Sequence, residues 1–68
     1  MKTVRLTLKA ARVNAGLDQK TAAEKLVISN KTLYSWEKGK TVPSIPQVEK
    51  ICALYKVSYD NLIFLPQS

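Results

Sequence analysis

Two short helical patterns, separated by a link of about three residues, constrain the fold of this chain more than any other feature. The segment 18–37 reads DQKTAAEKLVISNKTLYSWE, and its apolar residues recur at helical spacing on both sides of the letters VIS. Because so short a link leaves room only for a tight corner, one helix must brace the next. The second pattern opens with the small polar and cationic run SNKT, residues 29–32. A braced helix with such a start fits the DNA major groove, so we predict double-stranded DNA as the partner.

The excess positive charge lies on the half of the chain that contains this two-helix unit. Residues 1–40 hold nine Lys and Arg residues against three acidic ones, a net of +6, whereas residues 41–68 hold two of each. A surface that is charged merely for solubility would carry its charge evenly along the chain. The asymmetry therefore favours a polyanionic partner.

The cysteine and histidine content limits the other classes of function. The 68 residues include one cysteine, Cys52, and no histidine, so we expect no internal disulfide, no zinc site, no other metal and no cofactor. Cys52 lies in the apolar run ICAL, which favours a core position over a redox or dimer-linking role. A lone thiol fits a reducing compartment, and no apolar run is long enough to span a membrane. We therefore expect a cytoplasmic protein without a membrane partner.

Capping signals and apolar spacing predict five helices in a single all-α domain that covers residues 1–68. The predicted ranges are about 7–15, 19–26, 30–38, 45–55 and 59–64. The proposed N-terminal caps are the side chains of Thr7, Asp18, Ser29 and Ser58, together with a capping box formed by Ser44 and Gln47. Gly16 and Gly39 follow the first and third helices as left-handed caps. Leu33 and Trp36 share one face of the third helix, which favours the core over base stacking for Trp36.

Taken in order, these motifs resemble the lambda-repressor/Cro-like, or XRE, family of helix-turn-helix proteins. The resemblance is carried by GLDQKTAAEKL, VIS and NKTLYSWEKGKTVPS, followed by IPQVEKICALYKVSYDNLIF, and it covers roughly residues 6–65. It implies a compact five-helix DNA-binding domain that reads the major groove with its third helix. It also implies a sequence-specific transcriptional regulator, a repressor of phage or bacterial type.

Two residues depart from the family pattern. Val27 stands at the corner of the turn, where a glycine is common, and a β-branched residue at positive φ is costly. The turn is therefore either strained or built without that conformation. Asp18 stands where a neutral cap is common, and its charge would weaken the anion site at the start of the second helix.

The resemblance also assigns roles to individual residues. Gln19, at the first position of the second helix, is expected to lie against the DNA backbone and to support base reading. The other base-contacting residues that it implies are Ser29, Asn30, Lys31, Thr32 and Ser35. The phosphate-contacting residues that it implies in the following loop are Lys38, Lys40 and Thr41.

Side-chain chemistry supports the same surface. An Asn side chain such as Asn30 pairs with adenine N6 and N7, and a Lys side chain such as Lys31 donates to guanine O6 and N7. For Lys31 a phosphate contact is an equal alternative, and for Asn30 and Thr32 the alternative is a solvated first helical turn. Further phosphate candidates, each with a merely solvated position as its alternative, are Lys9, Lys20 and Tyr34.

Arg12 and Glu37 match a pair of positions that form an ion pair in the family. Such a pair would tie the first helix to the third and leave Arg12 near the DNA backbone. We favour the structural role over a phosphate contact, and we expect the loss of either partner to be costly.

The C-terminal run Leu62–Pro66 reads LIFLP and is more apolar than a short helix requires. The resemblance implies a homodimer on DNA through this end, on an inverted-repeat operator with half-sites about one DNA turn apart. The candidate interface residues are Ile63, Phe64 and Leu65. The alternative is that Leu62 and Phe64 close the core.

An enzymatic function is disfavoured. The chain has no histidine and no glycine-rich phosphate loop, and its five carboxylates are scattered without an evident acid/base pair. The alternative to a regulator is a small antitoxin or protein-interaction module that uses the same fold to bind a protein partner. An exclusive protein binder of this kind would lack a steep salt dependence for duplex DNA.

Overall fold

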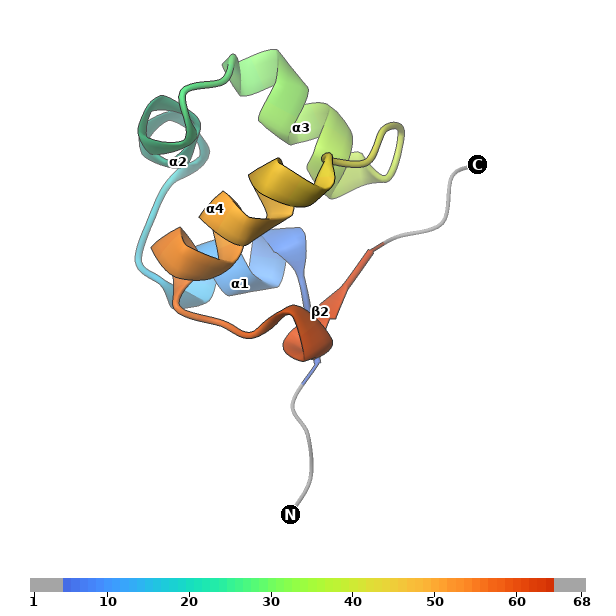
Figure 1. Ribbon diagram of the computed structural model, residues 1–68. Coiled ribbons are helices and arrows are strands. Elements are labelled where there is room, and N and C mark those ends of the chain that lie inside the picture. The colour runs from blue at the N-terminus through green and yellow to red at the C-terminus, as the bar shows by residue number, and fades with distance from the viewer. Residues whose placement is uncertain (1–4, 65–68) are drawn as a thin grey trace.

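The computed structural model describes residues 5–64, which form four α-helices, a short 3-10 helix and two short strands (Figure 1). In chain order the elements are β1 (Leu6–Thr7), α1 (Leu8–Asn14), α2 (Gln19–Leu26), α3 (Asn30–Lys38), α4 (Ile45–Tyr55), η1 (Tyr59–Asn61) and β2 (Leu62–Ile63). The first four predicted helices are therefore present, and α1 is one residue shorter at each end than expected. A largely helical fold follows for the described residues.

Side-chain caps mark where the helices begin, at the positions that the sequence predicted. Each capping oxygen accepts a hydrogen bond from the backbone amide three residues further along. The three bonds are Ala10 N to Thr7 Oγ1 (3.1 Å), Thr21 N to Asp18 Oδ1 (2.7 Å) and Thr32 N to Ser29 Oγ (3.0 Å). At the start of α4, Oε1 of Gln47 accepts from the backbone N of Ser44 at 2.9 Å, as a capping box requires. These contacts satisfy amides that have no partner within the helix, so the caps fix the register of each helix along the chain.

The predicted fifth helix, 59–64, is wrong. The chain makes one 3-10 turn at Tyr59–Asn61 and then becomes extended, with Leu62 at φ −94° and ψ 139°. Ser58 precedes this turn without a side-chain cap bond, contrary to its predicted role. A helix of less than two turns has few internal hydrogen bonds to offset the cost of its nucleation, so tertiary contacts decide the conformation of such a segment.

A parallel pair of strands takes the place of that helix. Leu6 lies opposite Leu62 and Thr7 lies opposite Ile63, so β1 and β2 join the two ends of the described chain. The pairing buries Leu62 in the core. The sequence gives no sign of these strands because two residues are too few for an alternating pattern.

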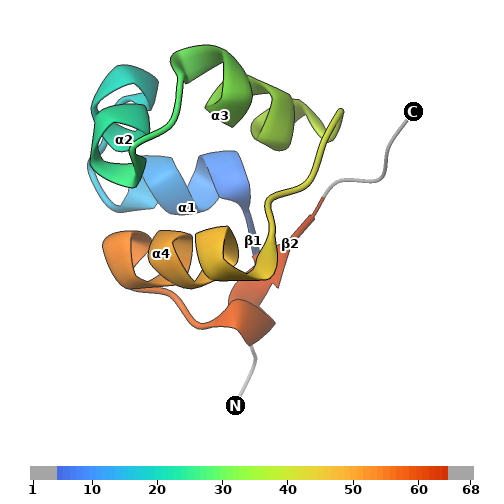
Figure 2. The same cartoon turned by 45° about the horizontal axis from the view of Figure 1, so that its top comes forward.

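The core lies among the four helices. Leu33 of α3 and Ile51 of α4 are its largest fully buried side chains. Ala22 and Ala23 are also buried, and their small side chains allow α2 to approach α3 and α4 closely. Figure 2 shows α1 between α3 and α4, with α2 covering one end. Trp36 is buried in this core, which confirms the packing role predicted for it.

Val27 holds a left-handed conformation at the corner between α2 and α3. Its φ is 58° and its ψ is 47°, which lets the following amide of Ile28 bond to the carbonyl of Ala23 at 3.0 Å. The side chain is 83% exposed, so its burial contributes little free energy to offset the cost of the strained backbone. Of the two possibilities that the sequence left open, the structure therefore has the strained turn.

Replacing Val27 by glycine is expected to stabilise the protein by about 1 kcal/mol. Removing a Cβ from the left-handed region relieves about 1–2 kcal/mol, and the added freedom of the unfolded chain takes back about 0.5–1 kcal/mol. Urea denaturation of Val27→Gly would show a higher midpoint at an unchanged slope. Lys56 has the same φ of 58° without a β-branch, so Lys56→Gly is the matched control and should gain less. An equal or lower midpoint for Val27→Gly would contradict the strain.

Candidate nucleic-acid interface

A buried ion pair joins α1 to the C-terminal half of α3. Nε of Arg12 donates to Oε2 of Glu37 at 2.7 Å, and Nη2 donates to Oε1 at 3.3 Å. A third bond runs from Nη1 to the carbonyl oxygen of Leu17 at 2.9 Å. Arg12 and Glu37 are only 7% and 9% exposed, and the hydrogen bond to Glu37 raises the pKa of the Arg12 guanidinium. The pair thus brings α1, α3 and the segment before α2 together.

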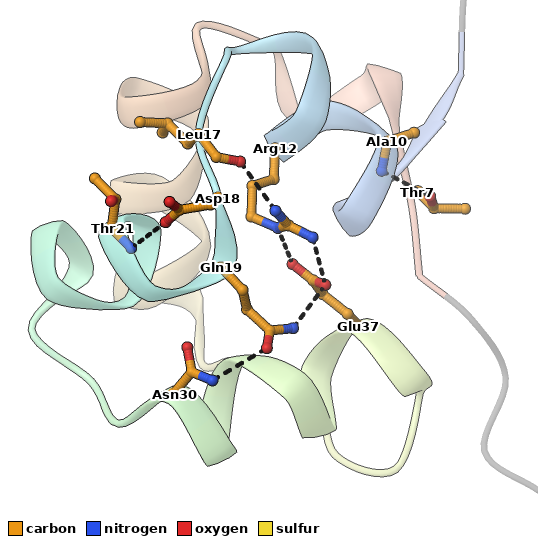
Figure 3. A network of polar contacts seen from close by, with 9 residues as sticks. All are labelled: Thr7, Ala10, Arg12, Leu17, Asp18, Gln19, Thr21, Asn30 and Glu37. Carbon is orange, nitrogen blue, oxygen red and sulfur yellow. Dashed lines mark hydrogen bonds and ion pairs between the residues drawn. The ribbon is translucent and has the colours of Figure 1, made fainter.

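Two side-chain amides extend this ion pair to the protein surface (Figure 3). Nε2 of Gln19, the first residue of α2, donates to Oε1 of Glu37 at 3.1 Å. Oε1 of Gln19 in turn accepts from Nδ2 of Asn30, the first residue of α3, at 3.2 Å. A continuous set of hydrogen bonds therefore leads from the buried carboxylate to an exposed side chain at the start of α3.

The base-contacting candidates of α3 and its N-cap differ in their hydrogen bonds and in their exposure. Ser29 Oγ accepts from the Thr32 amide and lies 2.8 Å from Thr32 Oγ1, so both hydroxyls already have hydrogen bonds. Asn30 and Lys31 are exposed, whereas Thr32 and Ser35 are half-buried. Among the base-contacting candidates of α3, Asn30 and Lys31 are therefore the most accessible.

Several of the phosphate-contacting candidates surround one pocket. It has a volume of about 270 Å³ and is lined by Lys9, Arg12, Gln19, Tyr34, Glu37 and Lys38. The ammonium of Lys38 lies 5.5 Å from the centroid of the Tyr34 ring, a cation–π distance. The remaining candidates are exposed but do not line this pocket; they are Lys20, Lys40 and Thr41.

Asp18 places a negative charge at the start of α2. The hydrogen bond from the Thr21 amide lowers the pKa of this carboxyl, which is therefore ionised at neutral pH. Its carboxylate accepts from one amide of this helix start and meets the positive end of the helix dipole, both of which a phosphate would otherwise use. An anion at this helix start therefore has to rely on neighbouring side chains.

The sequence does not predict the hydrogen bond between Gln19 and Glu37. The two residues are 18 positions apart, and no local pattern relates a glutamine at one helix start to a glutamate at another helix end. The same holds for the bond between Gln19 and Asn30, which are 11 positions apart. The sequence indicated only that Gln19 stands at the start of α2, and not which side chains it contacts.

The apolar residues at the C-terminal end of the described chain differ in their exposure. Ile63 is 37% exposed, whereas Phe64 packs against the core with its ring 6.2 Å from that of Tyr59. Leu65, the third dimer candidate, lies outside the described residues. Beside this end, a pocket of about 540 Å³ is lined by Ile45, Val48, Glu49, Cys52 and Tyr59.

Two other properties of the described chain bear on its class. Within residues 5–64, no His, Cys, Asp and Glu side chains gather in threes to hold a metal ion. In the same range, no helix combines the length and apolar character needed to cross a membrane.

The α2–corner–α3 unit, with its polar helix start and its support from α1, defines a helix-turn-helix protein. The sequence profile of the helix-turn-helix family matches residues 8–62, and the chain belongs to this family, as its XRE-type motifs predicted. One similar protein is the HTH-type transcriptional regulator ImmR of Bacillus subtilis (strain 168), which is 45% identical over 56 residues. The match covers 82% of this chain and 44% of ImmR, so the chain spans less than half the length of that relative. No solved structure matches the chain.

Proposed function

We propose that this protein binds double-stranded DNA in a sequence-specific manner, with α3 in the major groove, and thereby regulates transcription. The observation that carries the proposal is the exposed pair Asn30 and Lys31 on a helix start that the buried Arg12–Glu37 pair supports. Amide and ammonium groups distinguish base pairs in the major groove by their donors and acceptors. Groups that are held by packing and hydrogen bonds keep the geometry that such reading requires.

The cations around the 270 Å³ pocket supply the contacts to the DNA backbone. Lys9 and Lys38 are exposed at this pocket, and Tyr34 adds a hydroxyl. Lys20, Lys40 and Thr41 extend the set. Arg12 is buried with three of its donor atoms in use, so it acts chiefly as a support for this surface.

A homodimer on an inverted-repeat operator is part of the proposal. Ile63 is exposed at the C-terminal end, and the exposed apolar residues Val42, Ile45 and Tyr59 line a pocket together with Phe64. Contiguous apolar surface of this kind is typical of a protein interface. Two copies that meet at this end would present two α3 helices to successive turns of DNA.

Repression is the regulatory outcome that we propose. ImmR is a transcriptional regulator by name, and the region it shares with this chain contains the whole helix-turn-helix unit. A small dimer that occupies an operator blocks other proteins from the same DNA without needing a catalytic site.

Selection of binding sites from a randomised duplex pool tests this function. We expect enrichment of an inverted repeat with half-sites centred about one DNA turn apart. Enrichment of a single unrepeated site would overturn the dimer but leave DNA reading intact. No enrichment over bulk duplex would overturn sequence-specific binding and favour an antitoxin or protein-interaction module.

The salt dependence of DNA binding is expected to weaken when Lys9 and Lys38 are both changed to glutamine. Each phosphate contact contributes about 0.9 to the slope of log affinity against log salt, so the slope should fall by roughly 2. Fluorescence anisotropy over a salt series measures it. Lys50→Gln plus Lys56→Gln, which removes two cations from the neutral half of the chain, is the matched control and should leave the slope unchanged. Equal changes in both double variants would contradict the placement of the phosphate contacts.

A further inference from the structure

A groove lies between α4 and the turn η1, away from the proposed DNA contacts. The pocket of about 540 Å³ is lined by Tyr59 of η1 and by four residues that share one face of α4: Ile45, Val48, Glu49 and Cys52. A second pocket, of about 250 Å³, has Ile45, Val48 and Tyr59 in common with the first, so the two join into one groove. A groove of this volume has room for a small organic molecule.

The walls of the groove are mostly apolar. Val48 is buried and Cys52 is half-buried, whereas Ile45 and Tyr59 are 67% and 58% exposed. Burial, together with the charge of Glu49, raises the pKa of the Cys52 thiol, which therefore stays uncharged at neutral pH. Water in the groove covers apolar and aromatic surface, and a ligand with an apolar part would release it.

Glu49 gives the groove a negative charge. No Lys or Arg residue of the described chain lines either pocket, and Glu49 has no ion-pair partner within residues 5–64. Its neighbours four positions away along α4, Ile45 and Ala53, are uncharged. The groove is therefore opposite in sign to the pocket beside α3, which Lys9 and Lys38 line.

We infer that this groove binds a small apolar amine in its cationic form. The ammonium group meets the carboxylate of Glu49 and the ring of Tyr59, which attracts a cation through its π-electrons. The apolar part of the amine covers Ile45, Val48 and Cys52. Glu49 repels an anion of the same shape, and a neutral molecule gains only the apolar contacts. The inference does not depend on the proposed binding of DNA.

Titration of the free protein with 3-phenylpropylamine, followed by ¹H–¹⁵N NMR, tests the site. We expect the amide signals of the groove residues to move together, with a dissociation constant on the order of 1 mM for a ligand of this size. The matched ligands are the neutral 3-phenylpropanol and the anionic 3-phenylpropanoate. The alcohol should bind about fivefold more weakly than the amine, and the acid more weakly still.

Substitution of Glu49 tests the choice of charge. Glu49→Gln should weaken amine binding by about two- to fivefold and leave the affinity for the alcohol unchanged. Glu49→Lys should reverse the order, so that 3-phenylpropanoate binds more tightly than the amine. Glu24→Gln, the same substitution at an exposed carboxylate of α2, is the matched control and should bind the amine as the wild type does. Both positions are exposed, so the variants should remain folded.

Several results would overturn the inference. Equal affinities for the amine and the alcohol would reduce the groove to apolar surface without a choice of charge. An amine affinity that Glu49→Gln leaves unchanged, or signals that move throughout α2 and α3, would have the same consequence. Ile45 and Tyr59 also belong to the apolar surface of the proposed dimer, so the amine competes with a second copy there. Groove signals that move on dilution of the protein but not with the amine would assign the groove to a second copy instead.

Discussion

Arg12→Ala is expected to lower the free energy of unfolding by about 3–5 kcal/mol. The substitution leaves the carboxylate of Glu37, with a side chain only 5% exposed, without its ionic partner. Gln19 still donates one hydrogen bond to it, but a neutral amide offsets little of the desolvation of a charge. A chain of this size has a total stability of about 3–10 kcal/mol, so a substantial fraction of the variant should be unfolded at 25 °C. Urea denaturation followed by Trp36 fluorescence measures the loss.

Two controls separate the ion pair from simple packing. Lys9→Ala, an exposed cation on the same helix, should change stability by less than about 0.5 kcal/mol. Arg12→Met plus Glu37→Leu replaces both charges by apolar side chains of similar volume and should lose far less than Arg12→Ala. A double variant as unstable as the single one would show that the cost lies in packing rather than in an unpaired charge.

Asn30→Ala plus Lys31→Ala is expected to weaken binding to the selected DNA site by at least about thirtyfold. Each good base contact contributes about 1–3 kcal/mol of discrimination, so the loss of two amounts to about 2–6 kcal/mol. Binding to a scrambled duplex should fall by less than about tenfold, because only one cation is lost. Anisotropy titrations of both duplexes at one fixed salt concentration give the two values.

Asn61→Ala plus Lys50→Ala is the matched control, because it changes the same two residue types outside the α2–α3 surface. It should leave both affinities unchanged. Both double variants should remain folded, since Asn30, Lys31 and Lys50 are exposed and Asn61 is half-buried. If the selected and scrambled duplexes lost affinity equally in Asn30→Ala plus Lys31→Ala, base reading by the start of α3 would be contradicted.

The helix starts were predictable because their signals are local. Thr7, Asp18 and Ser29 each cap an amide three positions further along, so the residues that interact are visible within a few letters of sequence. The family pattern located the corner as well, but it left open whether Val27 takes the strained conformation, and the structure decides for the strained turn. Local reasoning failed at 59–64, where a partner more than 50 residues away decided the conformation.

The roles of individual residues divide in the same way. Exposed Asn30 and Lys31 follow from the polar start of α3, whereas the hydrogen bonds of Ser29 and Thr32 with each other became apparent only in the structure. Whether these four residues contact DNA remains a prediction that the selection experiment addresses.

The sequence by itself determined the positions of four helices, the polar start of α3 and the placement of the positive charge, since each depends on residues close together in the chain. Only the tertiary structure decided that β1 and β2 pair and that Glu37 reaches Asn30 through Gln19. Hydrogen bonds between residues 11 to 18 positions apart depend on how the helices pack, and no periodicity or cap encodes them. The physical reason is that a hydrogen bond forms only where the fold brings its donor and its acceptor within about 3 Å of each other.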